Sequence, residues 1–154
     1  MQCIVVRMSL LENTRATYDY EIIDKLEAGI ELFGYEVKSL RAKLGSLKGA
    51  RVLARGGEAY LVGATIPPWQ MANAPKDYDP ARNRRLLLSK KEIMAVSGAE
   101  SQKGLTIIPL SVYNSGRLLK LSLAVVRGKK AHDKRASIRE REDKRSINRS
   151  LKIN

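Results

Sequence analysis

Residues 105–128 read "LTIIPLSVYNSGRLLKLSLAVVRG", and this stretch predicts a β-hairpin that turns at Asn114-Ser115-Gly116. The returning strand has an apolar residue at every second position, namely Leu119, Leu121, Leu123 and Val125. That period is typical of a strand with one buried face. Lys120 lies between these positions, so we expect its side chain to point away from the core.

A second hairpin and a long strand complete the predicted β-structure. Residues 50–66, "ARVLARGGEAYLVGATI", place two β-rich runs around Gly56-Gly57, a dipeptide that favours a tight turn. Residues 18–32, "YDYEIIDKLEAGIEL", predict a strand in which Gly29 marks a bulge or a close approach of another backbone. Because about six strands leave sheet edges to be covered, we predict a mainly β fold. It is a small OB-type β-barrel of about five or six strands with two or three flanking short helices.

Two helices are predicted beside this barrel. Residues 33–43, "FGYEVKSLRAK", carry apolar residues at helical spacing. Ser89 and Glu92 lie three apart, as in a capping box, which predicts a helix from about Lys90 to Val96 or a little beyond.

Between the second hairpin and that helix, residues 67–82 hold four prolines and are expected to form a long surface loop. We expect Trp69 to anchor this loop to the core. Asp77 and Asp79 are close enough to suggest a metal-dependent nuclease, but no third acidic partner accompanies them. Acidic residues in such a loop are more often turn formers.

The motifs of common enzyme sites are missing from the sequence. His132 is the only histidine and Cys3 the only cysteine, so neither a histidine metal cluster nor an internal disulfide can form. No GxxxxGK[ST] or GxGxxG phosphate loop is present. We therefore expect a protein that is not an enzyme and needs no cofactor or metal, in a reducing, cytoplasmic compartment.

No apolar run approaches the roughly 18–20 residues that cross a bilayer. The opening "MQCIVVRMSLLENTR" lacks the charged leader and the cleavage site of a signal peptide, and Met8 is an alternative start.

Charge is the most unusual property of the chain. Its 154 residues carry 29 Lys and Arg against 16 Asp and Glu, a formal net charge of +13. Residues 1–127 hold 19 basic and 12 acidic side chains, and residues 128–154 hold 10 and 4. A surplus concentrated at one end favours a polyanionic partner, nucleic acid or an acidic membrane surface, over a merely solvated face.

The tail, residues 128–154, is not expected to fold alone. It has no aromatic residue and few aliphatic ones, so burial cannot offset the entropy of ordering it. Glu140 and Lys144 lie four apart, as do Ile147 and Leu151, a spacing that supports a marginal helix. We therefore expect a folded body, 1–127, and a flexible tail, 128–154, that becomes ordered against a charged partner.

Basic residues also gather in two shorter stretches, "RNRRLLLSKK" (82–91) and "RGKKAHDKR" (127–135). Arg84 and Arg85 in the first are candidates for phosphate contacts, because arginine forks bind phosphate oxygens in any sequence context. In the second, the ring of His132 is either a stacking surface for a base or simply solvated.

Four ordered blocks resemble the SsrA-binding protein family (small protein B, SmpB). They read "YEIIDKLEAGIELFGYEVKSLR", "DPARNRRLLLSKKEI", "KGLTIIPLSVYNSGRLLKLSLAVVRGKK" and "HDKR..IREREDKR". The resemblance extends from about Asn13 to Leu151 and implies an OB-type barrel with a basic tail that is disordered when free. It further implies a monomeric partner of transfer-messenger RNA in trans-translation.

In that role the protein binds the tRNA-like domain of transfer-messenger RNA and delivers it to stalled ribosomes. The tail is expected to become helical in the empty mRNA channel, at the decoding centre of the small-subunit rRNA. Ribosome rescue and tagging of the incomplete protein follow, with no catalysis by the protein itself.

The resemblance also assigns roles to single residues. Contacts to transfer-messenger RNA fall on Asn13, Glu27, Leu87 and Lys120, beside the phosphate candidates Arg84 and Arg85. The decoding-centre residues of the tail are Gly128, Lys129, Lys130, His132, Asp133, Lys134 and Arg135, followed by the apolar pair Ile147 and Leu151. Thr14 and Tyr18 stand where the family usually has a basic residue and a histidine.

Two other functions are compatible with the sequence. A general nucleic-acid-binding or ribosomal structural protein would have the same composition, but would bind unrelated RNA equally well. A small metal-dependent nuclease would cut RNA in the presence of magnesium.

Overall fold

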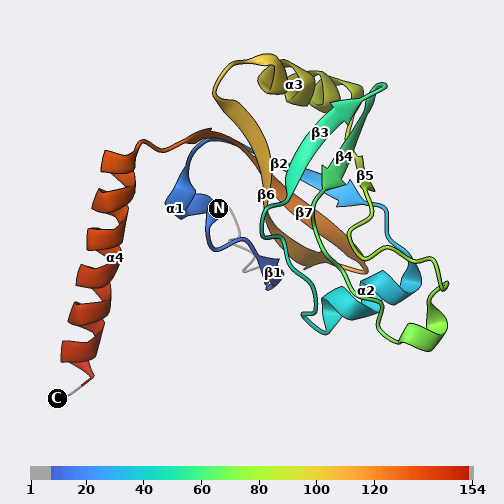
Figure 1. Ribbon diagram of the computed structural model, residues 1–154, viewed down its shortest axis with the longest axis horizontal. Coiled ribbons are helices and arrows are strands. Elements are labelled where there is room, and N and C mark those ends of the chain that lie inside the picture. The colour runs from blue at the N-terminus through green and yellow to red at the C-terminus, as the bar shows by residue number, and fades with distance from the viewer. Residues whose placement is uncertain (1–7, 153–154) are drawn as a thin grey trace.

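The computed structural model describes residues 8–152, apart from the side chains of residues 131–133. Cys3 therefore lies outside the described residues. The described part holds one antiparallel sheet and four α-helices (Figure 1). The strands are β1 (Ser9–Glu12), β2 (Tyr20–Ile30), β3 (Arg51–Arg55), β4 (Glu58–Val62), β5 (Arg84–Leu87), β6 (Leu105–Ser115) and β7 (Leu118–Gly128). The helices are α1 (Ala16–Asp19), α2 (Gly34–Arg41), α3 (Lys90–Ser101) and α4 (Ala131–Leu151), with a short 3₁₀ turn at Met71–Asn73.

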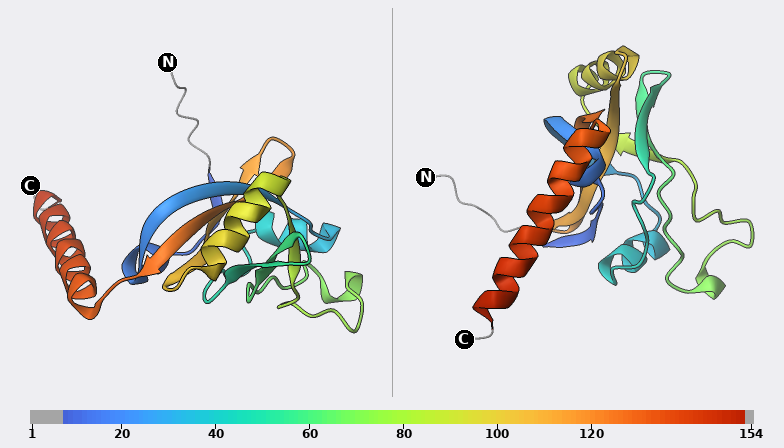
Figure 2. Two further views of the ribbon diagram at one scale, coloured as in Figure 1. Left: turned by 90° about the horizontal axis from the view of Figure 1, so that it is seen from above. Right: turned by 60° about the vertical axis from the view of Figure 1, so that its left-hand side comes forward.

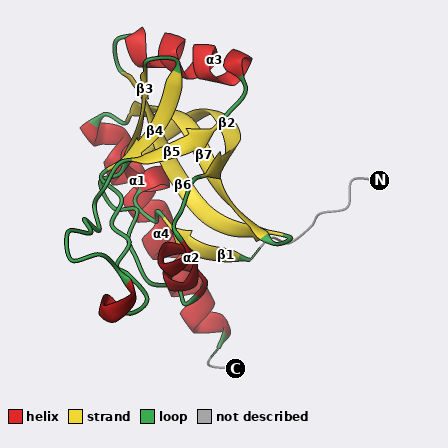
Figure 3. Cartoon of the chain, turned by 90° about the vertical axis from the view of Figure 1, so that its right-hand side faces the viewer, coloured by secondary structure: helices red, strands yellow, loops and turns green. Residues whose placement is uncertain are grey.

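The mainly β fold is confirmed, whereas the closed barrel is wrong. The strand order is β1-β6-β7-β2-β5-β4-β3, so β1 and β3 are the edges of the sheet in the described structure. The strands curl, with α3 across one end and α2 near the other (Figure 3). This curl brings β3 back beside β6, but no strand pairing joins the two in the described part. The result is a curled sheet that stays open along one side.

Both predicted hairpins are present. Gly56 and Gly57 connect β3 to β4 with φ of 59° and 75°, the left-handed backbone that a tight hairpin turn requires. The second turn lies between Ser115, where β6 ends, and Leu118, where β7 begins, two residues further along than the predicted start of the turn. The predicted alternation in β7 holds at its inner positions, since Leu119, Leu121, Leu123 and Val125 are all buried.

The core fills the inner face of the curled sheet. Its buried members come from all strands except β1, from α2 and α3, and from the loops before β3 and after β4. They include Ala28, Leu40, Val52, Leu61, Leu86, Val96, Ile107, Val112, Leu121 and Leu123. On the outer face, Ala16 of α1 packs on Ile108, Ala124 and Val126 in a second, smaller cluster. Strand β7 is therefore buried on both faces from Leu123 to Val126 and is partly exposed on its outer face nearer its start, at Lys120 and Ser122.

Helix α3 contacts both β3 and β6 and so crosses the open side at one end of the sheet. Its start is the predicted capping box: the Ser89 side chain accepts a hydrogen bond from the Glu92 amide, and the Glu92 carboxylate accepts one from the Ser89 amide. At the other end, Glu100 Oε2 accepts a hydrogen bond from the Ala54 amide at 2.9 Å, and Glu100 Oε1 pairs with Arg55 at 2.7 Å. The Glu100 side chain thus accepts the hydrogen bond that the Ala54 amide of edge strand β3 would otherwise offer to another strand, and this protects the open edge.

A buried ionic cluster anchors the proline-rich loop. Glu36 of α2 is completely buried and accepts hydrogen bonds from Arg82 and Arg84, each at a shortest distance of 2.6 Å. Arg84 also donates to the carbonyl oxygens of Ala64 and Pro80 and to the Tyr78 hydroxyl, which in turn donates to Ile66 O at 2.7 Å. Trp69 is 45% exposed. The Trp69 amide donates to Tyr35 O of α2 at 3.2 Å. That the Trp69 ring anchors the loop to the core stays a prediction, and charge pairing and Tyr78 hold the loop as well.

The tail forms one helix, α4, which extends away from the sheet (Figure 2). Among the described side chains, its first half contacts the body through α1, and every residue from 139 to 152 has an exposed side chain. Glu140 and Lys144 form the expected pair at 2.8 Å. Disorder of this segment in the free protein stays a prediction. No helix in the described part of the chain is long and apolar enough to span a membrane.

Candidate nucleic-acid interface

Gly29 is the centre of an exposed surface on the outer face of the sheet. In the strand pairing, Gly29 of β2 stands opposite Leu87 of β5 on one side and Lys120 of β7 on the other. One step along, Glu27 stands opposite Ser122. Paired residues of antiparallel strands project from the same face. The register therefore brings together Glu27, Leu87 and Lys120, three residues that are far apart in the sequence.

Gly29 allows Leu87 to approach the sheet closely. A Cβ atom there would lie 3.1 Å from the Cβ of Leu87, closer than ordinary van der Waals contact. The prediction of a bulge or a close backbone approach at Gly29 is wrong, because the close group is the side chain of Leu87 and the bulge of β2 lies between Ile22 and Asp24. Because Gly29 has no side chain, Leu87 lies across a flat piece of sheet while remaining 54% exposed. An exposed leucine beside bare backbone offers a partner an apolar platform.

Strand alternation explains why Arg84 and Arg85 have different environments. Along β5 the residues alternate between buried and exposed, so Arg84 and Leu86 face the core while Arg85 and Leu87 face outward. Arg84 has no exposed surface, and its guanidinium donates hydrogen bonds to Glu36 and to the Pro80 carbonyl oxygen of the loop. The prediction that Arg84 contacts phosphate does not fit this geometry, and we leave Arg84 out of the interface.

Arg85 does lie on the outer face. Its side chain is 49% exposed and lies 3.6 Å from Glu58 Oε1 and 3.9 Å from Glu31 Oε2. The Tyr60 hydroxyl donates to Glu58 Oε2 at 2.6 Å, and this hydrogen bond to a carboxylate raises the pKa of Tyr60 above 10.0. Exposed ion pairs of this kind are weak, so Arg85 can exchange its carboxylate partners for phosphate at little cost.

Asn13 is held at the far side of the same face. Its amide donates to Leu110 O at 2.8 Å, and its side-chain Nδ2 donates to Pro109 O at 3.1 Å, where β6 has a bulge. It lines a shallow hollow of about 290 Å³ that also includes Lys25 and Ser111. Lys25 stands on the outer face of β2 two residues before Glu27, so this hollow links Asn13 to the Gly29 surface.

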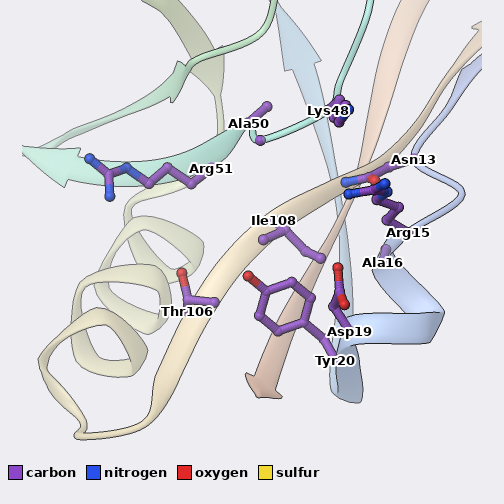
Figure 4. A pocket seen from close by; sticks show the side chains of 11 residues that line it. Asn13, Arg15, Ala16, Asp19, Tyr20, Lys48, Ala50, Arg51, Thr106 and Ile108 are labelled. Carbon is purple, nitrogen blue, oxygen red and sulfur yellow. The ribbon is translucent and has the colours of Figure 1, made fainter. Parts of the chain in front are cut away.

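Asn13 also borders a larger hollow, of about 390 Å³, between α1 and the loop that leads into β3. Figure 4 shows Asn13 and Arg15 at one end of it and Arg51 at the other. Lys48 lies on its rim as well. Sequence reasoning missed these basic residues, because Lys48 and Arg51 lie more than thirty positions after Arg15 and only the fold brings them beside it.

The tail residues lie well away from the Gly29 surface. Gly128 stands opposite Tyr20 at one end of the β2–β7 pair, and Lys120 stands opposite Gly29 at the other. Nine residues of strand span roughly 30 Å. Two regions of potential contact are thus held apart by the rigid pair β2–β7.

Within the tail, Lys130 and Arg135 are exposed, whereas Lys129 and Lys134 contact α1. The side chains of His132 and Asp133 lie outside the described residues. Ile147 and Leu151 are 58% and 71% exposed on one side of α4, which places two apolar side chains in water.

Comparison with known proteins gives a consistent result. The family model described as "SmpB protein" matches residues 10–153. An SsrA-binding protein of Synechococcus sp. (strain JA-3-3Ab) is 46% identical over 144 residues, 94% of each chain. One of Microcystis aeruginosa (strain NIES-843 / IAM M-2473) is 43% identical over 143 residues, 93% of each chain. A solved structure described as "tmRNA-SmpB: a journey to the center of the bacterial ribosome" is 45% identical, with a TM-score of 0.66 over 79% of this chain and 85% of that one.

Proposed function

The chain belongs to the SmpB protein family, and from this premise we propose that it is an RNA-binding factor of trans-translation. It binds the tRNA-like domain of transfer-messenger RNA, delivers it to stalled ribosomes, and places its tail in the empty mRNA channel. It acts as a monomer in the RNA complex, in the cytoplasm where ribosomes work, and catalyses no reaction itself. Within the described residues, no three His, Cys, Asp or Glu side chains are close enough to hold a metal ion.

The observation that carries the proposal is the convergence on the outer face. Glu27, Leu87 and Lys120 come from three strands and meet around Gly29. Lys120 supplies a cation for a phosphate, and Leu87 an apolar surface for a base or ribose. The carboxylate of Glu27 is an acceptor for ribose hydroxyls or base amino groups. A uniformly basic patch would bind any RNA through its phosphates. A surface with a cation, a carboxylate and an apolar side chain binds best to an RNA whose folded shape presents matching groups to all three.

The proposed division of labour follows the geometry. The sheet, with Asn13, Glu27, Arg85, Leu87 and Lys120, binds transfer-messenger RNA. The tail, beginning at Gly128, works on the ribosome through Lys129, Lys130, His132, Asp133, Lys134 and Arg135, and then through Ile147 and Leu151. The two exposed apolar residues late in α4 support a tail that is completed by a partner, since they gain burial only when something covers them.

A general nucleic-acid-binding protein is the second candidate, favoured by the net charge of +13. A titration of transfer-messenger RNA against an unrelated structured RNA of equal length, over a salt series, separates the two. We expect transfer-messenger RNA to bind more tightly at every salt concentration, and both affinities to fall as salt rises because counterions are released. Equal affinity for the two RNAs would favour the general binder.

Lys120→Ala tests the interface itself. We expect about a tenfold loss of affinity and a salt slope shallower by roughly one unit, since one phosphate contact is removed. Lys103→Ala is the matched control, because Lys103 is an exposed lysine in the turn before β6 and lies outside the Gly29 surface. Equal losses in both variants would show that Lys120 contributes only general charge.

A further inference from the structure

We propose that the hollow between α1 and the loop before β3 is a binding site for the phosphate backbone of RNA, with Arg15, Lys48 and Arg51 as its phosphate-binding residues. The site adjoins the Gly29 surface but is separate from it. That RNA is the partner rests on the proposed function, whereas the charge and shape of the hollow are properties of the folded body.

The hollow carries a positive charge that the described structure leaves unpaired. Its lining holds the three cations and one carboxylate, that of Asp19, around a volume of about 390 Å³. In the described part of the chain, none of the three cationic groups makes an ion pair or donates a side-chain hydrogen bond. Arg55, also on β3, is by contrast paired with Glu100 at 2.7 Å. Unpaired cations around one hollow repel one another, and a polyanion bound across them removes that repulsion.

Two of the cations are placed by regular elements of the fold. Arg51 begins β3 and is exposed, whereas the next residue, Val52, is buried in the core. Arg15 directly precedes α1, and its carbonyl oxygen accepts a hydrogen bond from the Asp19 amide at 2.9 Å. Because the neighbouring Ala16 is buried against the sheet, Arg15 is held at the rim of the hollow.

Lys48 is placed by a short loop that is tied to the body. Ser46 exchanges two backbone hydrogen bonds with Thr65, at 2.8 and 3.0 Å, and Leu47 is buried. Gly49 follows with a φ of 76°, the left-handed backbone that turns the chain into β3. A cation on an anchored loop loses less conformational entropy on binding than one on a mobile loop, so this position favours a binding role.

The shape of the hollow fits a chain of phosphates better than a single small anion. All three cations are exposed, so one phosphate held there would remain largely in water. Figure 4 shows Arg15 and Lys48 at one end and Arg51 at the other, so that successive phosphates of one strand meet cations at both ends. Between them, Tyr20 and Thr106 offer hydroxyl groups to phosphate or ribose oxygens.

Asn13 joins this hollow to the Gly29 surface. It lines the hollow and also lines the smaller one, of about 290 Å³, that opens onto the outer face of β2. An RNA strand that follows the outer face past Asn13 therefore arrives at the three cations, which makes transfer-messenger RNA the expected source of the phosphates. Ribosomal RNA is the other source, since Tyr20 stands opposite Gly128, where the tail begins.

The test compares two charge-matched double variants of the full-length protein. Lys48→Ala/Arg51→Ala removes two cations of the hollow. Lys76→Ala/Lys103→Ala is the control, because it removes two exposed lysines that lie outside both the hollow and the Gly29 surface. Affinity for transfer-messenger RNA, and for ribosomes without transfer-messenger RNA, is measured over a salt series, and thermal unfolding checks that both variants are folded.

We expect Lys48→Ala/Arg51→Ala to bind transfer-messenger RNA at least about tenfold more weakly than wild type, with a salt slope shallower by roughly two units, since two phosphate contacts are lost. The control should lose less than about threefold. A loss confined to the ribosomes would support the phosphate site and assign it to ribosomal RNA. Equal losses in both variants, or no loss toward either partner, would overturn the proposal.

Failure of the proposed function gives a different result. Wild-type protein that binds transfer-messenger RNA and an unrelated structured RNA equally well would contradict the proposed function. The difference between the two variants would still decide whether the hollow binds phosphate, because phosphate contacts do not depend on sequence.

Discussion

Glu36 is the residue on which the proline-rich loop most depends. Its carboxylate is fully buried and neutralises two arginines, and no buried side-chain polar atom in the described structure is left without a partner. Arg82 is held so that its guanidinium lies 4.3 Å from the centre of the half-exposed Phe33 ring. A charge pair in such a place is costly to break, because the remaining charge stays buried.

Glu36→Gln removes the negative charge and keeps the shape. We expect it to lower the free energy of unfolding by about 3 kcal/mol or more, since Arg84 is left buried without a counter-charge. Urea unfolding followed by circular dichroism measures this. Glu31→Gln is the control, because Glu31 pairs with Arg85 on the surface at 3.9 Å and its loss should cost less than about 1 kcal/mol. Similar costs would mean that burial does not set the strength of these pairs.

Glu100 gives the protein a pH-dependent contribution to stability. The hydrogen bond from the Ala54 amide, helped by Arg55, lowers the pKa of Glu100 below 4.5. A carboxyl whose pKa is lower in the folded than in the unfolded state stabilises the protein above its unfolded pKa, and this stabilisation is lost as the pH falls through the folded value. We expect Glu100→Gln to be less stable than wild type at about pH 7, and this difference to shrink as the pH falls below 4.5. A difference that stays constant across this range would contradict the assignment.

At the scale of elements, some helices and strands are determined by local sequence and others by contacts with distant parts of the chain. The capping box of Ser89 and Glu92 predicts the start of helix α3 from sequence alone. The helix ends at Ser101, five residues after Val96, because its later turns pack on β3 and β6. Strand β1 and helix α1 are only four residues each and carry no periodic signal. They exist because β6 offers β1 a pairing edge and because Ala16 fills a space on the outer face.

The capping box of α3 should make a measurable contribution to the free energy of unfolding. Ser89→Ala removes the acceptor for the Glu92 amide, and we expect the free energy of unfolding to fall by about 1 kcal/mol. Ser97→Ala, an exposed change within the same helix, should be neutral or slightly stabilising, since alanine is the better helix former. Thermal or urea unfolding of both variants tests the pair. Equal effects would show that helix propensity, and not the cap, governs this end.

At the scale of the whole molecule, the outer face is where prediction from sequence ends. Alternation in β7 suffices to turn Lys120 outward. It cannot place Lys120 beside Leu87, because that requires the register of β2 against both β5 and β7. Arg84 and Arg85 are adjacent in sequence but lie on opposite faces of the sheet. The sequence pattern could not predict which of them faces the core, because β5 has only four residues. The family resemblance identified Glu27, Leu87 and Lys120 as candidates, whereas their position beside one another follows only from the fold.

Openness of the sheet is also a property of the whole molecule. The prediction of a closed barrel took closure as the simplest way to cover the sheet edges. Here Glu100 covers an amide of β3, and α3 crosses the gap between β3 and β6. The body therefore protects its edge without closing, and none of the buried core residues comes from the described side chains of α4. A body that owes none of its core to the tail should fold without it.

Removal of residues 128–154 tests most directly the division between a sheet that binds RNA and a tail that acts on the ribosome. The truncated protein and the full-length chain are compared for transfer-messenger RNA affinity and for tagging on stalled ribosomes, in the same buffer. We predict that the truncated protein keeps most of its affinity for transfer-messenger RNA and supports no tagging. Loss of RNA binding with tagging retained would contradict the account.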